Sequence, residues 1–308
     1  MKITPDDPNP IPPEAFQEPP SSPLPPAFDA REIDMPNGRA ALPPARVPPP
    51  SYSQYPEDLR APWGWIDLLL LVAITFFGTF IVSIFLVGGF AAFGMTPSAL
   101  QKSVGERSLF LIVNQTLLSL GLLAYLATQI RLRFQSPFWQ TIGWRPLETG
   151  GIPRRVVYLG LILGGFALSL LIQLASAAFQ NKTKMPIETF FQDRRSAFLL
   201  MLMGVLIAPL VEETIFRGYI YPVIARSFGV GAGVVITGAM FGLLHAPQLW
   251  GGWGQIALLI VVGIVFTAAR AISRTVVASY FLHVSYNSFL FIAFLVASHG
   301  LRHLPVGP

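Results

Sequence analysis

The stretch that decides the fold is FLLMLMGVLIAPLVEETIFRGYIYPVIA, residues 198–225. Its length and apolar composition predict a membrane-crossing helix over about residues 196–226, because about 20 apolar residues are needed to span a bilayer. Two adjacent acids, Glu212 and Glu213, interrupt the apolar run. An ionised carboxylate in hydrocarbon costs about 2.5–3.5 kcal/mol on insertion scales, so such residues usually face a bundle interior and have a function there.

The composition of the whole chain also indicates a membrane protein. Of its 308 residues, 53% are hydrophobic and only 12% are charged, whereas roughly 25% are charged in soluble domains. The apolar runs are continuous rather than alternating, which disfavours a transmembrane β-barrel. The net charge of +5 comes from basic residues between these runs, so we expect no nucleic-acid partner. The absence of cysteine excludes disulfides, thiolate catalysis and Cys-ligated zinc.

The predicted fold is all-α: a polytopic transmembrane helical bundle of about seven spans, preceded by a disordered Pro-rich N-terminal tail. More than half of the 28 prolines lie in the first 62 residues, a composition that cannot form a packed core. The expected spans cover about residues 65–93, 108–130, 156–179, 196–226, 231–247, 254–271 and 275–297. The predicted division is 1–62 for the tail, 63–195 for three N-terminal spans, 196–297 for the last four and 298–308 for a C-terminal tail.

Basic residues predict the orientation of the bundle. The link between spans two and three contains five arginines and one acid, Arg217 and Arg226 end span four, and Arg270 and Arg274 lie between spans six and seven. With seven spans, all these positions share one side with the N-terminal tail. The positive-inside rule places that side in the cytoplasm, although the opposite link, 180–195, also contains four basic residues.

Helix geometry gives the two acids different surroundings. Neighbouring residues are about 100° apart around a helix, so the two carboxylates cannot point in one direction. Glu213 precedes Arg217 by four residues, the order that favours an ion pair, and one interpretation of Glu213 is therefore a structural carboxylate. Glu212 has no cation at that spacing. It is a candidate general base if it faces a cavity, and otherwise a carboxylate satisfied by the backbone or by another helix.

Two later spans contain the other costly polar groups. The segment TGAMFGLLHAPQ places His245 one turn after Phe241, and YFLHVSYNSFLF places His283 and Asn287 on one helix face. Taken singly, His245 could be a hydrogen-bonded core residue, and the His283–Asn287 pair could join two helices. With Glu212 they match what water activation requires: a base, histidines that orient water, bind a metal or stabilise an oxyanion, and an amide donor.

Three sequence blocks resemble the CPBP intramembrane proteases, a family of CAAX-prenyl-endopeptidase and bacteriocin-processing proteins also called Abi. They are EExxxR at Glu212–Arg217, FxxxH at Phe241–His245 and HxxxN at His283–Asn287, and they cover about residues 197–293. The resemblance implies a helical membrane fold with a polar cavity open towards the cytoplasm. It also implies hydrolysis of a peptide bond near the C-terminus of a peptide or membrane-associated protein substrate at the lipid bilayer.

The resemblance implies roles for the site residues as well. Glu212 would activate the water with His245 helping to hold it, and His283 and Asn287 would stabilise the oxyanion. Zinc is implied for a metalloprotease, in which case Glu212, His245 and His283 would be its ligands. A metal-free, glutamate-activated water is equally compatible with these residues. The remaining pair, Glu213 and Arg217, would shape the site.

Two other classes of function stay open. A non-catalytic protein of the same fold, such as a scaffold, an immunity-type factor or a peptide- or lipid-binding protein, would keep the helices without the reaction. A small transporter or proton relay would use the buried acid and histidines, but the sequence shows no repeated half that would favour it.

The relative depth of Glu212 and His245 tests the catalytic interpretation. Counted from the expected span ends, Glu212 lies about 7 Å from Arg217, whereas His245 lies about 21 Å from Gly231. Equal depth therefore requires tilted helices or a later start of the fifth span. Pro209, one turn before the acids, is expected to kink span four and open a cavity.

Overall fold

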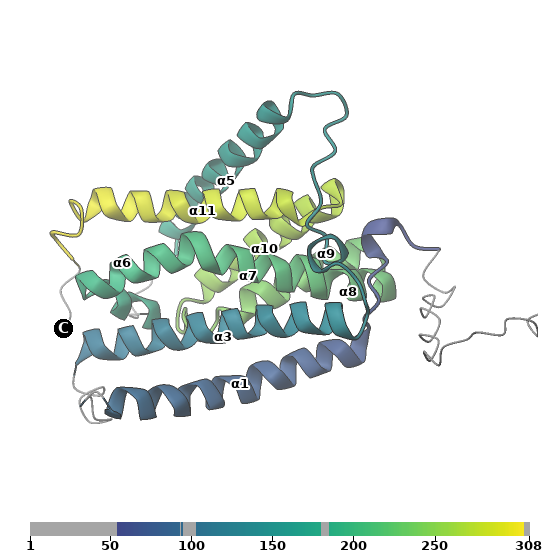
Figure 1. Cartoon of the computed structure of the whole chain (residues 1–308). Coiled ribbons are helices and arrows are strands. Elements are labelled where there is room, and N and C mark those ends of the chain that lie inside the picture. Colours follow the sequence, from purple (N-terminus) through teal and green to yellow (C-terminus); the bar gives the residue numbers. More distant parts are fainter. Residues whose placement is uncertain (1–53, 93, 95–102, 180–184, 305–308) are drawn as a thin grey trace, which may run out of the picture. The chain divides into compact units, whose positions relative to one another are not determined.

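The computed structural model describes residues 54–92, 94, 103–179 and 185–304, and every regular element among them is a helix (Figure 1). The predicted all-α fold is confirmed. Within this part of the chain, six helices are long and apolar enough to cross a membrane by length and composition. They are α1 (Trp65–Ala92), α3 (Val104–Leu132), α5 (Arg154–Ala177), the continuous helix from α6 to α8 (Arg194–Phe228), α10 (Trp253–Ser273) and α11 (Val276–Ala297).

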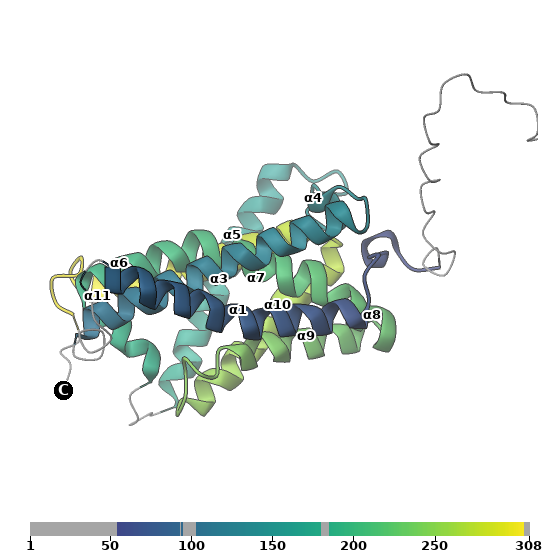
Figure 2. The same ribbon diagram turned by 60° about the horizontal axis from the view of Figure 1, so that its bottom comes forward.

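The fifth expected span is a shorter helix, α9 (Val230–Leu244). Its 15 residues measure about 22 Å, against a hydrocarbon core about 30 Å thick. A single residue, Gly229, separates α9 from α8, and its φ of 87° lies in the left-handed region that favours glycine. The helix packs along α10 (Figure 2), and the link that follows it begins at His245.

The two-glutamate helix is interrupted by two π-helical turns that flank the acids. Such turns are rare and are frequent at functional sites. Pro209 lies at the start of the segment between the two turns, where the expected kink would fall. In order, the helix consists of α6 (Arg194–Leu202), the π-turn η4 (Met203–Ile207), α7 (Ala208–Glu213), the π-turn η5 (Thr214–Ile220) and α8 (Tyr221–Phe228).

Two arginines that the sequence placed at span ends are buried inside the bundle. The two-glutamate helix continues past Arg217 to Phe228, and the Arg217 side chain has no exposed surface. Arg270 lies in the last turn of α10, also without appreciable exposure, and its Nη1 is 3.0 Å from Asp58 Oδ2. Both charges are compensated within the protein, so neither reports on the side of the membrane. The cytoplasmic position of the tail stays a prediction.

Residues 54–62, which the sequence assigned to the disordered tail, pack against the last helices. They include a short 3-10 helix, η2 (Glu57–Leu59). Leu59 and Ala61 are buried, and the Arg226 guanidinium donates to the carbonyl oxygens of both. The packed bundle therefore begins earlier than residue 63, and the rest of the predicted tail, residues 1–53, lies outside the described part of the chain.

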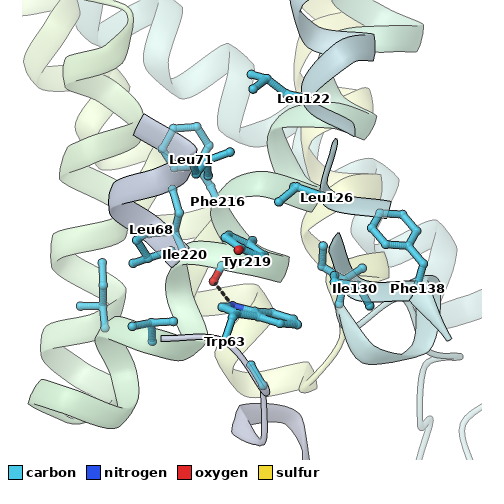
Figure 3. Close-up of a cluster of buried hydrophobic side chains, with 14 of the residues drawn as sticks. Trp63, Leu68, Leu71, Leu122, Leu126, Ile130, Phe138, Phe216, Tyr219 and Ile220 are labelled. Atoms are coloured by element: carbon cyan, nitrogen blue, oxygen red, sulfur yellow. Dashed lines mark hydrogen bonds between the residues drawn. The ribbon is translucent and has the colours of Figure 1, made fainter. Parts of the chain in front are cut away.

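Trp63 leads from this segment into the main apolar cluster (Figure 3). The side chain is fully buried, its ring stacks on Tyr219 at 4.7 Å, and its Nε1 donates to the Tyr219 carbonyl at 2.8 Å. Leu126 and Ile130 of α3 pack into the same cluster. The cluster therefore holds α3 and the N-terminal segment against η5, which contains the second half of the EExxxR block.

Glycines allow α9 and α10 to touch through their backbones. A Cβ added at Gly238 would lie 2.5 Å from the Ile264 backbone nitrogen, and one at Gly242 would lie 2.6 Å from that of Ile260. Small residues are typical of such close helix contacts in membranes. The contact fixes the position of the end of α9, where His245 is located.

Candidate active site

Arg217 lies fully buried at the inner end of the site. Its Nη1 donates to Glu213 Oε1 at 2.9 Å, its Nη2 to the Gly263 carbonyl at 2.8 Å, and its Nε to Thr267 Oγ1 at 3.2 Å. The guanidinium also lies 4.5 Å from the centroid of the Phe241 ring, within the range of a cation–π contact. The predicted ion pair between Glu213 and Arg217 is present and completely buried.

His283 connects α11 to this pair. Its Nδ1 lies 2.8 Å from Glu213 Oε1 and donates to that carboxylate, while its Nε2 lies 3.7 Å from Glu212 Oε2. A carboxylate bound to one imidazole nitrogen fixes both the orientation of the ring and the role of the other nitrogen. Glu213 therefore holds two donors, Arg217 and His283, and directs His283 Nε2 at Glu212.

His245 is held by the backbone of its own helix. Its Nδ1 is 2.8 Å from the carbonyl oxygen of Phe241, a contact that requires a proton on Nδ1. In the neutral ring the other nitrogen, Nε2, is then a hydrogen-bond acceptor. This Nε2 lies 4.0 Å from Glu212 Oε1. The acceptor of the ring proton is thus the backbone carbonyl four positions before His245.

Glu212 lies between the two histidine Nε2 atoms. Its side chain is 25% exposed, it makes no hydrogen bond to any other described residue, and it lines a cavity of about 380 Å³. Glu213 accepts two hydrogen bonds at one oxygen, Oε1, whereas Glu212 faces the cavity. The two adjacent acids therefore have different surroundings, as helix geometry predicted.

The unequal depths expected for Glu212 and His245 came from a wrong span end. Measured to the true end of its helix at Phe228, Glu212 lies 16 residues (228 − 212) in, or about 24 Å. His245 lies 15 residues (245 − 230) beyond the start of α9 at Val230, or about 22 Å. The two side chains meet without a later start of α9.

Asn287 lines the same cavity one turn after His283, but its amide has a partner on another helix. Asn287 Nδ2 donates to the carbonyl oxygen of Gly204 at 2.8 Å. Gly204 belongs to the π-turn η4, so this bond ties α11 to the irregular part of the two-glutamate helix. The donation of Asn287 to an oxyanion stays a prediction.

The cavity runs from this centre towards the end of the bundle at which α6 begins. Its outer lining includes Phe191 of η3 (Pro186–Phe191), Gln248 of the α9–α10 link and Gln255 of α10. The N-terminal segment docks at the other end, where Trp63 contacts Tyr219. The described N-terminal segment and the outer lining of the cavity therefore lie at opposite ends of the bundle.

The three candidate zinc ligands lie farther apart than the ligands of a bound zinc ion, and the zinc site stays a prediction. Ligand atoms around tetrahedral zinc lie roughly 3.3 Å apart, whereas Glu212 lies 3.7 and 4.0 Å from the two Nε2 atoms. No group of three His, Cys, Asp or Glu residues in the described ranges is arranged to hold a metal. Two atoms that both hydrogen bond to the same water are roughly 4–4.6 Å apart. The 4.0 Å between Glu212 Oε1 and His245 Nε2 is closer to that distance than to the distance between two zinc ligands.

The fold and this centre define the class of the protein: an all-helical integral membrane protein with an acid–histidine site inside the bundle. Residues 194–289 match the family model described as type II CAAX prenyl endopeptidase Rce1-like. The matched range includes all six predicted site residues and confirms the predicted resemblance to the CPBP family. Searches of curated proteins and of solved structures each found no match.

Several residues of the site were not predicted from the sequence. Gly263 and Thr267 complete the shell around Arg217, and Gly204 accepts from Asn287. Gly263 and Thr267 are small residues four positions apart in an apolar helix, which indicates a helix contact. Nothing in the sequence indicated that Arg217 is the group they contact.

Proposed function

We propose that this chain is an intramembrane endopeptidase of the CAAX-endopeptidase kind, in which Glu212 activates the attacking water. The observation that carries the proposal is the position of the Glu212 carboxylate, 4.0 Å from His245 Nε2 and 3.7 Å from His283 Nε2 at the inner end of a cavity. The family match supports a protease. The substrate would be a peptide or a membrane-associated protein.

We infer a role for both protons of the water from the contacts of Glu212 and His245. His245 donates from Nδ1 to Phe241 and can only accept at Nε2 in its neutral form. A water between the two groups would donate one proton to Glu212 and the other to His245 Nε2. Its remaining lone pairs are then free to attack the carbonyl carbon of the scissile bond. Glu212 takes the proton as the C–O bond forms and passes it to the amine nitrogen as the C–N bond breaks.

His283 has the opposite task in this mechanism. Its Nδ1–H stays bonded to Glu213, so a second proton on Nε2 makes it a donor to the oxyanion that develops on the scissile carbonyl. Donors fixed in advance of the reaction stabilise such charge most effectively. Glu213 and Arg217 act through His283: the guanidinium holds the carboxylate, and the carboxylate holds the ring. Asn287 is proposed as a second donor through its remaining amide N–H.

Glu212→Gln tests the proposal, because the change preserves size and removes the base. Purified protein in lipid nanodiscs would be incubated with a library of synthetic peptides, and new termini would be identified by mass spectrometry. Cleavage should fall at least 1000-fold in the variant and remain unchanged in Glu148→Gln, a matched substitution at an exposed position outside the site. Cleavage that survives Glu212→Gln would refute the mechanism.

Metal analysis of the same preparation separates the two forms of water activation. Full activity without bound metal and in the presence of a chelator is the expected result. Stoichiometric zinc, together with activity that a chelator removes and zinc restores, would show that Glu212 and the two histidines move closer to bind a metal.

A further inference from the structure

The outer part of the cavity has a lining chemistry that the proposed reaction does not use. Among the described residues that line it, Glu212 is the only acid and no lysine or arginine is present. Apart from Glu212 and the two site histidines, the polar lining consists of neutral groups. These are Gln115, Gln173, Ser176, Gln248, Gln255, Tyr286 and Asn287.

Three of the glutamines have unused hydrogen-bonding groups. Gln173 on α5, Gln248 in the α9–α10 link and Gln255 in the first turn of α10 make no side-chain hydrogen bond to any residue that the structure describes, whereas Gln115 has Ser119 within 3.5 Å. Each free amide offers two donors and one acceptor oxygen. The three side chains come from different elements and line one cavity, with Gln248 exposed and Gln173 and Gln255 half-buried.

The rest of the outer wall is apolar and has the length of a short peptide. Along α10 the lining runs from Gln255 to Phe266, 11 residues or about 17 Å. Along α11 it runs from His283 to Phe291, eight residues or about 12 Å. An extended chain advances about 3.3 Å per residue. Roughly four or five residues therefore fit between Glu212 and the outer end of the cavity, which is lined by Gln255 and Phe291.

We propose that this outer cavity binds an extended, uncharged peptide segment whose backbone hydrogen bonds to Gln173, Gln248 and Gln255. This inference rests on the proposed function and names its substrate class. A peptide backbone presents a donor and an acceptor at each residue, and each is costly to bury unpaired. Neutral amides satisfy these groups without selecting a charge. A charged side chain in the middle of the substrate has no lysine, no arginine and no acid other than Glu212 among the described lining residues to pair with.

The first test uses the wild-type chain and changes only the peptide. Dye-labelled decapeptides of Ala, Leu, Val, Ser and Phe, acetylated and amidated at their ends, would be titrated into protein in nanodiscs. Binding is followed by fluorescence anisotropy. Matched peptides with one Glu or one Lys within the central five positions should bind at least tenfold more weakly. Equal binding of neutral and charged peptides would overturn the inference.

The second test changes the glutamines. Gln173→Leu, Gln248→Leu and Gln255→Leu should each weaken binding of the neutral peptide about 2- to 12-fold, the range expected for one neutral hydrogen bond. Gln140→Leu is the matched control, since Gln140 is exposed on α4 (Phe138–Thr141), outside the cavity. If a fluorescent isoprenoid binds in the cavity and no peptide does, the assignment to peptide is wrong.

These experiments can refute the substrate-binding inference and the proposed reaction independently of each other. If neutral peptides bind in a glutamine-dependent way but none is cleaved, the substrate-binding inference stands and the proposed reaction is refuted. If peptides are cleaved while charge and the three glutamine variants leave KM unchanged, the reaction stands and the inference falls. Where the glutamines bind substrate, KM rises in each variant and kcat changes less than twofold.

Discussion

The buried carboxylate of Glu213 allows the sharpest prediction about how the site is held. It accepts from Arg217 Nη1 at 2.9 Å and from His283 Nδ1 at 2.8 Å, and neither its side chain nor that of Arg217 has exposed surface. Glu213→Gln keeps the shape of the side chain and one acceptor oxygen. It removes the negative charge that both donors face.

The expected loss of stability follows from these two contacts. A hydrogen bond to a charged group contributes about 1.5–3 kcal/mol and a neutral one about 0.5–1.5 kcal/mol, so replacing two charged bonds by neutral ones costs roughly 2–3 kcal/mol. Removing one partner of a buried ion pair typically costs about 3–5 kcal/mol, because the other charge stays buried. Arg217 keeps its bonds to Gly263 and Thr267. We therefore expect Glu213→Gln to lower the free energy of unfolding by about 3 kcal/mol.

A double-mutant cycle measures the interaction itself. The free energy of unfolding in mixed micelles would be followed by the fluorescence of the six tryptophans for wild type, Glu213→Gln, Arg217→Met and the double variant. The double variant should be more stable than the sum of the single losses predicts by about 2 kcal/mol, within the range found for residues in one network. Glu148→Gln should be neutral. Additive losses, with a coupling below about 0.5 kcal/mol, would refute the view that Glu213 compensates the buried guanidinium.

Two further perturbations test the surroundings of the site. Gly238→Ala should destabilise the protein by about 1–3 kcal/mol and reduce activity, because its Cβ would meet the Ile264 backbone and displace α9 with His245. Gly231→Ala is the control, since its Cβ meets nothing within 4 Å, and it should change neither stability nor activity. Equal melting temperatures for the two variants would contradict this prediction. The backbone N–H of Ser196 holds the pKa of Asp193 below its usual range, so this N-cap stabilises α6 above the usual aspartate pKa and loses its effect as the pH falls through the lower folded-state pKa. At pH 7 the free energy of unfolding should therefore be about 0.3–1 kcal/mol higher for wild type than for Asp193→Asn. A difference that persists below the folded-state pKa of Asp193 would contradict this prediction.

Local features of the site followed directly from the sequence. The spacing of Glu213 and Arg217 on one helix was sufficient to predict their ion pair, because contacts within a helix depend only on its known geometry. The apolar runs similarly predicted the membrane-spanning helices. The three motif blocks, taken together, predicted that residues from three helices meet at Glu212.

Contacts between helices could not be predicted in the same way. The bond from His283 to Glu213 depends on the rotation of α11 relative to α7, which no spacing within one helix specifies. Arg270 was misplaced for a related reason. A terminal arginine is usually solvated, whereas here Asp58 folds onto α10 and pairs with the buried guanidinium. The π-turns on either side of the two acids were not predicted from the sequence either.

The ends of the bundle give one more prediction, on how the protein is oriented in the membrane. The N-terminal segment binds Tyr219 and Arg226, near the end of the two-glutamate helix, whereas the cavity mouth is formed by η3, just before its start. Phe191 of η3 also contacts Phe294, near the end of α11, with ring centroids 4.5 Å apart. The C-terminal end of α11 and the mouth thus share one end of the bundle.

The chain has no cysteine, so single cysteines at the exposed residues Gln54 and His303 can be labelled with a membrane-impermeant maleimide without background. We expect Gln54→Cys and His303→Cys to react from opposite sides of the membrane. Labelling of both from one side would contradict the structure. If His303→Cys is the protected one in intact cells, the cavity opens towards the cytoplasm as the family resemblance implies, and the charge-based orientation of the tail is wrong. That orientation already rests on fewer charges, because Arg217 and Arg270 are buried in ion pairs.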